Sequence, residues 1–101
     1  MEITTHTEAG LVQLRLKGRF DFNAHHAFRQ AGEEALQQPH VSRIFIDFAN
    51  VDYLDSSALG MLLILREKAQ AAGRSIELKN CRNTVAQVFE IANFGKLFRI
   101  G

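Results

Sequence analysis

The chain has 101 residues, of which 47% are hydrophobic and 23% are charged, and its formal net charge is +1 at pH 7. This composition fits one compact domain with a substantial core, and it excludes a disordered chain. Lysine and arginine are spread along the chain without a basic block, so the sequence gives no sign of a nucleic-acid interface.

The composition also indicates where the protein works. Cys81 is the only cysteine, so an intramolecular disulfide is excluded. Residues 1–10 lack the apolar segment of a signal peptide, and the longest apolar run, residues 58–65, is far too short to cross a membrane. We therefore expect a cytoplasmic protein without direct membrane insertion.

The first part of the chain predicts two strands and a helix. Residues 1–7 and 11–17 have strand character, and apolar and polar side chains alternate in the second of them. Gly18 is expected to end this strand. A helix is predicted over about residues 24–37, where Pro39 stops it.

Residues 41–48, VSRIFIDF, form a nearly continuous apolar run. Apolar side chains on both faces indicate an inner strand of a sheet that helices cover on both sides. A loop through Asn50 and Asp52 is expected to follow. It leads to a second helix over about residues 56–72, with Gly73 directly after its end.

The remaining residues predict a strand, a helix and a short final strand or tail. The strand covers residues 75–80, Asn83 is expected to cap the helix, and Gly95 is expected to end it before residues 96–100. Two strands followed by helix–strand alternation predict a single α/β domain over residues 1–101. Its sheet is expected to be mixed and mainly parallel, with four to five strands flanked by helices.

The most informative motif, LDSSALG at residues 54–60, opens the second predicted helix. One residue is enough to cap a helix, yet Asp55, Ser56 and Ser57 stand together. If Asp55 is the cap, both hydroxyls stay free in the first turn, near the positive end of the helix dipole. A phosphate there adds about −1.5 to −2 charges and leaves the helix intact, which is what a reversible binding switch requires.

The same helix carries more apolar residues than one buried face needs. Its predicted buried stripe consists of Ala58, Leu62, Leu65, Ala69 and Ala72. Leu63 and Ile64 point away from this stripe, so either they form a docking surface or another element covers them. Gly60 costs about 1 kcal/mol relative to alanine inside a helix, which indicates a close backbone approach at that position.

These motifs resemble STAS domains, and specifically the single-domain bacterial anti-sigma factor antagonists. The resemblance covers almost the whole chain. It rests on the step Gly18-Arg19-Phe20-Asp21, on the strand IFIDF and above all on LDSSALGMLLILRE. In the family motif Asp-Ser-Ser/Thr-Gly-Leu-Gly, the serine directly after the aspartate is phosphorylated. That residue matches Ser56 here, with Ser57 as the second choice.

The resemblance implies a mechanism and a set of partners. The unphosphorylated chain would bind an anti-sigma factor, and a serine kinase with a histidine-kinase-type ATP-binding domain would phosphorylate Ser56 and abolish binding. A PP2C-type serine phosphatase would reverse the modification. ATP and metal ions belong to those partners, so this chain is expected to have no cofactor, metal or catalytic residue. The expected partner-binding residues are Asp21, Asp55, Ser57, Gly60, Leu63 and Ile64.

Two departures from the family pattern lie near the predicted site. Ala58 stands where the family usually has glycine, which should stiffen the start of the helix and slightly crowd the serine. Arg19-Phe20 stand where Glu-Leu is common, so the segment before Asp21 is expected to present different chemistry to a partner.

Three other functions are less well supported. Asp47 at the end of a central strand would suit a phosphorylated receiver domain, but Asp21 has no adjacent acid, so that residue set is incomplete. His25 and His26 point to different faces of a helix and make a poor metal chelate. Neither a phosphate-binding P-loop nor a nucleophile elbow occurs, so we expect no enzyme.

One alternative keeps the fold and changes the function. STAS domains also act as accessory subunits that dock on ABC-type membrane transporters without a phosphorylation switch. That role does not require the Asp55-Ser56-Ser57 motif. Its presence here favours the switch.

Overall fold

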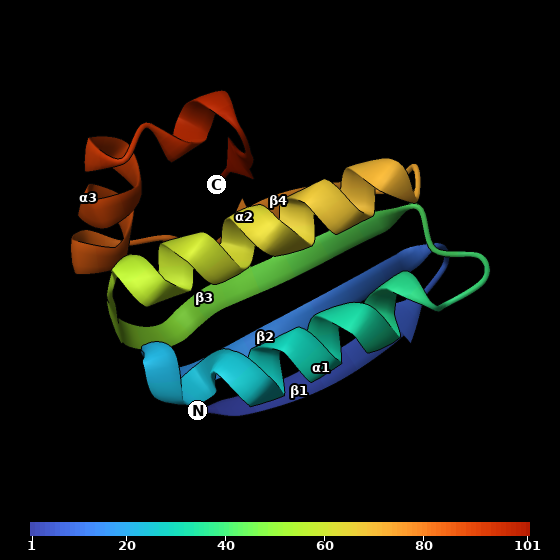
Figure 1. The fold of residues 1–101 in the computed structure, drawn as a ribbon, viewed down its shortest axis with the longest axis horizontal. Coiled ribbons are helices and arrows are strands. Elements are labelled where there is room, and N and C mark those ends of the chain that lie inside the picture. The colour runs from blue at the N-terminus through green and yellow to red at the C-terminus, as the bar shows by residue number, and fades with distance from the viewer.

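The computed structural model, which describes residues 1–101, contains one five-stranded sheet of order β1-β2-β3-β4-β5 (Figure 1). The strands are β1 (Glu2–Glu8), β2 (Leu11–Phe20), β3 (Arg43–Leu54), β4 (Ser75–Lys79) and β5 (Arg99–Ile100). β1 is antiparallel to β2, whereas β2, β3, β4 and β5 are parallel neighbours. The predicted mixed, mainly parallel α/β sheet is confirmed.

The helices join these strands. They are α1 (His25–Leu36), α2 (Ser56–Ala71) and α3 (Asn83–Ile91), with two short 3₁₀ turns, η1 (Phe22–Ala24) and η2 (Phe94–Lys96). α1 and α2 lie side by side across one face of the sheet, and α3 lies at one end of the molecule, beside β3 (Figure 1). The predicted helix ends at Pro39 and Gly73 agree with the structure, since α1 ends at Leu36 and Gly73 (φ +73°) follows the last turn of α2.

A single core fills the space between the helices and the sheet. Alternate side chains of β2 and of the first half of β3 contribute to it, followed by Val51 and Leu54 after the first register shift, together with Leu78 of β4 and the inner faces of the helices. The largest fully buried members are Phe20, Phe28, Phe48, Phe89, Leu14, Leu16, Ile44, Ile46, Leu62, Leu78 and Val12. Phe48 of β3 meets Phe89 of α3 edge to face at 5.3 Å between ring centroids, which ties α3 to the sheet.

The opposite face of the sheet is not covered by helices, so the expectation of helices on both sides of residues 41–48 is wrong. Phe45 points to this open face, where the guanidinium carbon of Arg43 lies 4.8 Å and the ammonium of Lys79 4.6 Å from its ring centroid. Cations over an aromatic face are favourable, and their aliphatic stems shield the ring from water. The side chains of Arg43 and Lys79 therefore shield Phe45 from water, as a second layer of helices would.

The third strand is longer than the sequence predicts. The sequence predicts a loop through Asn50 and Asp52, but residues 49–54 continue β3 to Leu54 and pair with the second half of β2. β4 ends at Lys79, opposite Asp47, so beyond that point β3 has a neighbour on one side only. Asn50 and Asp52 face solvent there. A strand with a free edge tolerates polar residues that would be excluded from the centre of a sheet.

Gly18 does not end the second strand, as was expected, because β2 continues to Phe20. Its φ of +107° is accessible to glycine and strained for other residues. Gly18 lies at one of two irregularities in the β2–β3 register, at each of which β3 contains one residue more than β2. The ten residues of β2 thereby pair along the full length of the twelve residues of β3, and the two strands end at the same level.

The ends of the third helix differ from the prediction. Arg82, not Asn83, is the residue before α3, and no side chain caps the helix. Asn83 has a φ of +53°, a left-handed conformation that asparagine adopts more readily than most residues. The helix ends at Ile91, before Gly95, because Asn93 takes a left-handed conformation (φ +58°) and Gly95 belongs to η2.

Candidate functional site

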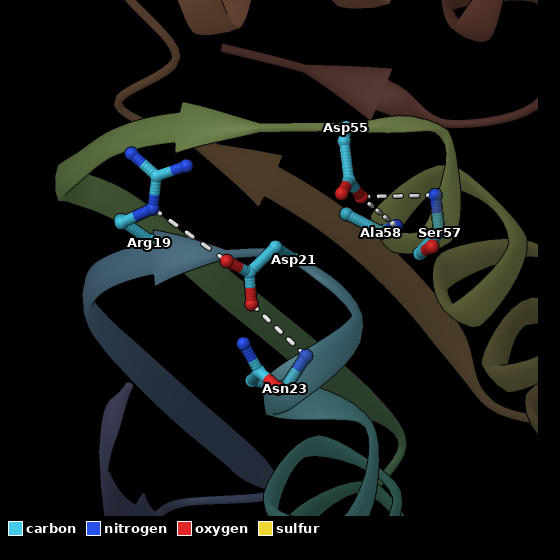
Figure 2. A network of polar contacts seen from close by, with 6 residues as sticks. All are labelled: Arg19, Asp21, Asn23, Asp55, Ser57 and Ala58. Carbon is cyan, nitrogen blue, oxygen red and sulfur yellow. Dashed lines mark hydrogen bonds and ion pairs between the residues drawn. The ribbon is translucent and has the colours of Figure 1, made fainter.

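The candidate site lies where β2 and β3 end side by side. Phe20 pairs with Leu54, and the next residue of each strand is an aspartate, Asp21 or Asp55. Both have extended backbones, with φ/ψ of −125°/−169° for Asp21 and −120°/−173° for Asp55. Each carboxylate accepts a hydrogen bond from the backbone N–H two residues further on and so starts a helix (Figure 2).

Asp55 caps α2, as predicted. Its Oδ1 accepts hydrogen bonds from the N–H groups of Ser57 (2.9 Å) and Ala58 (3.2 Å), and its carbonyl accepts one from Leu59 (3.3 Å). Of the first four N–H groups of α2, only that of Ser56 does not donate a hydrogen bond to Asp55. The cap therefore fixes the helix start and leaves one amide of the first turn next to the Ser56 side chain.

The three residues after the cap face in different directions. Ser56 is exposed, Ser57 is half-buried, and Ala58 is fully buried in the core. Successive helical residues are rotated by 100° about the helix axis. The first turn of α2 therefore exposes the hydroxyl of Ser56 to solvent and buries the methyl group of Ala58 in the core. The methyl group of Ala58, which stands where the related motif usually has glycine, fills core space.

A second polar cluster lies at the paired ends of β2 and β3, and the sequence did not predict it. The Nε of Arg19 lies 3.5 Å from Oδ2 of Asp21, and the guanidinium carbon lies 4.0 Å from the ring centroid of Tyr53 (Figure 2 draws the ion pair). Arg19 and Tyr53 are paired residues of β2 and β3. A loop through Asn50 and Asp52, as the sequence predicts, has no register with a strand, so this contact could not be predicted from it.

The charge at this end of the sheet is mainly negative. Asp21 and Asp55 lie at adjacent strand ends and Asp52 is exposed on β3, whereas Arg19 pairs with Asp21 and Arg82 lines the same pocket as Asp52. A phosphate on Ser56 would add charge of the same sign to an acidic surface. Chemically, such a site can change its charge strongly while its backbone hydrogen bonds stay in place.

Leu63 and Ile64 of α2 lie outside the core, as the helical pattern predicts. Leu63 is 36% exposed and Ile64 is 53% exposed, so no other element of the chain covers them. Ala72, the last residue of the predicted buried stripe, is exposed because α2 ends before it. The close approach expected at Gly60 is absent within the chain, since a Cβ atom built there would meet no atom within 4 Å.

The remaining candidates lie apart from Ser56. Asp47 accepts hydrogen bonds from the N–H of Ala49 (2.9 Å) and from Nδ2 of Asn80 (3.0 Å), so it links the middle of β3 to the residue after β4. His25 stacks on the exposed ring of Phe22, with 6.0 Å between ring centroids. No three His, Cys, Asp or Glu side chains are grouped as metal ligands would be, and none of the helices is both long and apolar enough to cross a membrane.

Comparisons with known proteins agree with this architecture. A family model described as "Mlab, STAS domain" matches residues 3–99. A STAS-domain containing protein of Pseudomonas aeruginosa (strain UCBPP-PA14) is 46% identical over 87 residues, which are 86% of this chain and 84% of that protein. An anti-sigma F factor antagonist of Lysinibacillus sphaericus is 33% identical over 85 residues, which are 83% of this chain and 72% of that protein.

Solved structures share the fold at lower identity. SpoIIAA, an anti-sigma factor antagonist, superposes in its unphosphorylated form with a TM-score of 0.75 at 23% identity, over 99% of this chain and 87% of that one. The phosphorylated form of the Bacillus protein gives 0.75 at 24% identity, over 99% and 91%. A sulfate transporter family protein of Wolinella succinogenes gives 0.80 at 12% identity, over 94% and 79%. At these identities the likeness is one of fold alone.

Proposed function

Because the chain belongs to the STAS domain family, we propose that it is an anti-sigma factor antagonist that acts in the cytoplasm as a phosphorylation-controlled partner switch. Its unphosphorylated form binds an anti-sigma factor or a serine kinase with a histidine-kinase-type ATP-binding domain. Phosphorylation of Ser56 releases that partner, and a PP2C-type serine phosphatase restores binding. The chain has no catalytic role in this cycle and holds no cofactor or metal of its own.

One observation carries the proposal: Ser56 is exposed in the first turn of a helix whose start is fixed by Asp55. A phosphate at that hydroxyl replaces none of the hydrogen bonds that the Asp55 carboxylate accepts. The modification therefore changes the surface and keeps the scaffold. SpoIIAA supports this part of the proposal, because its unphosphorylated and its phosphorylated form each share the fold of this chain, with a TM-score of 0.75.

The surrounding charge explains how a phosphate would release the partner. It would add about −1.5 to −2 charges beside Asp21 and Asp55 and enlarge the side chain inside a packed contact. A partner shaped for a neutral hydroxyl would lose that contact and meet like-charge repulsion. A difference of about 4 kcal/mol between the two states gives roughly a thousandfold change in affinity.

The residues of the proposed partner surface have distinct roles. Ser56 is the phosphoacceptor, Ser57 is a half-buried neighbour that supports the turn, and Asp55 orients both. Leu63 and Ile64 supply apolar contact area, and complete burial of such a side chain by a partner stabilises a complex by roughly 1.5–3 kcal/mol. Gly60 keeps the helix surface flat between Ser56 and Ile64, and Asp21 borders the surface from the neighbouring strand.

Docking on a membrane transporter is the alternative function, and the shared fold does not separate it from the switch. The switch is favoured by the exposed serine behind the Asp55 cap, which a purely structural dock does not need. Co-purification discriminates between the two. An antagonist brings down a kinase or an anti-sigma factor, whereas a transporter subunit brings down an ATPase and a membrane protein.

The direct test of the proposal is to map the modified residue. The purified chain is incubated with ATP and the histidine-kinase-type serine kinase from its own genome, and the product is analysed by peptide mass spectrometry. We expect one phosphate on Ser56 in the wild type and in Ser57→Ala, and none in Ser56→Ala. Full phosphorylation of Ser56→Ala together with loss in Ser57→Ala would move the site to Ser57, and no phosphorylation of any of the three would refute the switch.

A further inference from the structure

A groove between α1 and α2 opens on the side of the molecule that carries Ile64. Its volume is about 160 Å³, and its floor is formed by Phe28 of α1 with Met61 and Leu65 of α2, all buried core residues. Ile64 forms an exposed apolar wall. Pockets for drug-sized ligands usually measure about 300–1,000 Å³, so this groove suits a single large apolar side chain better than a small-molecule ligand.

The groove has a charged rim on both helices. Glu33 of α1 accepts a hydrogen bond from Nζ of Lys68 on α2 (3.0 Å) and from Nε of Arg29 (3.3 Å), and these contacts lower the pKa of its carboxyl. The carboxylate is ionised at neutral pH, and the rim of two cations and one anion keeps one net positive charge when His25, which also lines the groove, is counted as neutral. Lys68 and Arg29 each have further N–H donors that Glu33 does not use. The rim is therefore complementary to an acidic residue at the edge of the groove.

The groove is continuous with the surface around the phosphoacceptor. Ser56, Gly60, Ile64 and Lys68 are spaced four residues apart and form one row along α2. Ser56 and Ile64 are about 12 Å apart along the helix axis. Because no atom of the chain approaches Gly60, a partner segment lying on this row can contact the serine and enter the groove at the same time.

We propose that the α1–α2 groove receives one large apolar side chain of the partner protein, and that an adjacent acidic residue of the partner pairs with Lys68 and Arg29. The inference rests on the proposed function, since the partner is the one that Ser56 controls. It adds a second recognition element that sets affinity, while Ser56 sets the on and off states.

Three variants test the groove against the purified serine kinase used above, with affinity measured by isothermal titration calorimetry. Ile64→Ala removes the apolar wall and Lys68→Glu reverses the charge of the rim, so we expect each to weaken binding at least tenfold. Lys17→Glu is the matched control, because Lys17 is 72% exposed on a different element, β2, and has only a long 3.9 Å ion pair with Glu2. It should bind like the wild type, and circular dichroism should show all three folded.

Carbodiimide cross-linking identifies the partner group directly. In the free protein the reagent should join Lys68 to Glu33, whose side chains are in contact. In the complex we expect Lys68 to be joined to an aspartate or glutamate of the kinase. A cross-link between Lys68 and a second copy of this chain would overturn the proposal. Wild-type affinity of both Ile64→Ala and Lys68→Glu for the kinase would also overturn it.

The same series separates the groove from the switch. If phosphorylation of Ser56 abolishes binding while Ile64→Ala and Lys68→Glu bind normally, the groove proposal is wrong and the proposed function stands. If both variants bind weakly while phosphorylation changes nothing, the groove is an interface and the switch is wrong.

Discussion

Asp21 and Asp55 hold equivalent places at the ends of two paired parallel strands, and each carboxylate caps the helical turn that follows it. Oδ1 of Asp21 accepts from the N–H of Asn23 at 3.0 Å, and Oδ1 of Asp55 accepts from that of Ser57 at 2.9 Å. The irregularity at Gly18 helps to bring the two strand ends level. The Gly-x-x-Asp step and the Asp-Ser-Ser motif, far apart in the sequence, thus form one edge of the sheet.

The cap at Asp55 is expected to contribute to stability. Asp55→Ala leaves the N–H groups of Ser57 and Ala58 without their acceptor, which should lower the free energy of unfolding by about 1 kcal/mol. Asp55→Asn keeps an acceptor oxygen in place and serves as the control, with stability close to the wild type. Urea denaturation followed by circular dichroism measures both. Equal stability of Asp55→Ala and the wild type would show that the cap is not needed to fix the helix start.

Gly60→Ala is expected to separate stability from binding. The added methyl group meets no atom of the chain and removes the cost of glycine in a helix. The free energy of unfolding should therefore rise by up to about 1 kcal/mol, and thermal unfolding should move to higher temperature. If the row from Ser56 to Lys68 is the partner surface, the same methyl group overpacks the interface by roughly 1–3 kcal/mol and weakens partner binding at least about fivefold.

Gly95→Ala is the matched control for that prediction. A Cβ atom at Gly95 also meets nothing within 4 Å, but Gly95 lies in η2, outside the α2 row. It should leave partner affinity unchanged. Wild-type affinity of Gly60→Ala would place the interface elsewhere.

Glu77 makes stability depend on acid pH. Lys79 donates a hydrogen bond to its Oε2 (2.9 Å), and Arg99 and Arg43 lie 3.6 and 3.8 Å from its Oε1. The hydrogen bond from Lys79 and these charges hold its pKa below the ordinary value of 4.5, although burial opposes them. A carboxyl with a lowered folded-state pKa stabilises the protein above its unfolded-state pKa. That stabilisation is lost as the pH falls through the folded-state value.

The wild type should therefore be more stable than Glu77→Gln at about pH 7. The difference should shrink below about pH 4.5 and vanish once the folded-state carboxyl is protonated. Urea titrations of both proteins across this range give the measurement. A difference that stays constant down to about pH 3 would show that the charge of Glu77 is not what its neighbours stabilise.

Cys81 is expected to be unreactive in the folded protein. Burial, with a smaller contribution from the charge of Asp47, raises the pKa of its thiol to about 12. At about pH 8 only about one thiol in ten thousand is then ionised, and the thiolate is the species that alkylating agents attack. Iodoacetamide should label the protein slowly in buffer and much faster in urea. Equal rates in the two conditions would contradict the burial of this thiol.

Local chemistry made most of the fold predictable from sequence. Alternation in β2, the apolar run of β3 and the cap at Asp55 depend on neighbouring residues, and each lies where the pattern placed it. Leu63 and Ile64 were placed outside the core by helical geometry alone. Residue patterns of this kind need no knowledge of the rest of the chain.

The features that sequence did not predict depend on distant partners. The Arg19–Tyr53 contact requires the β2–β3 register, and that register includes two irregularities which composition does not reveal. The second half of β3 has the polar residues of a loop because only one strand flanks it. The groove beneath Ile64 depends on how closely α1 and α2 pack, and Gly32 permits that approach because a Cβ atom there would lie 2.8 Å from Leu65.

The phosphorylation switch is tested most directly by the affinity of one partner for the unmodified and the phosphorylated form of this chain. The chain is produced once unmodified and once with phosphoserine incorporated at position 56 during synthesis, and each form is titrated with the same anti-sigma factor or kinase. We expect superimposable circular dichroism spectra and binding at least a hundredfold weaker for the phosphorylated form. Equal affinities of the two folded forms would contradict the switch.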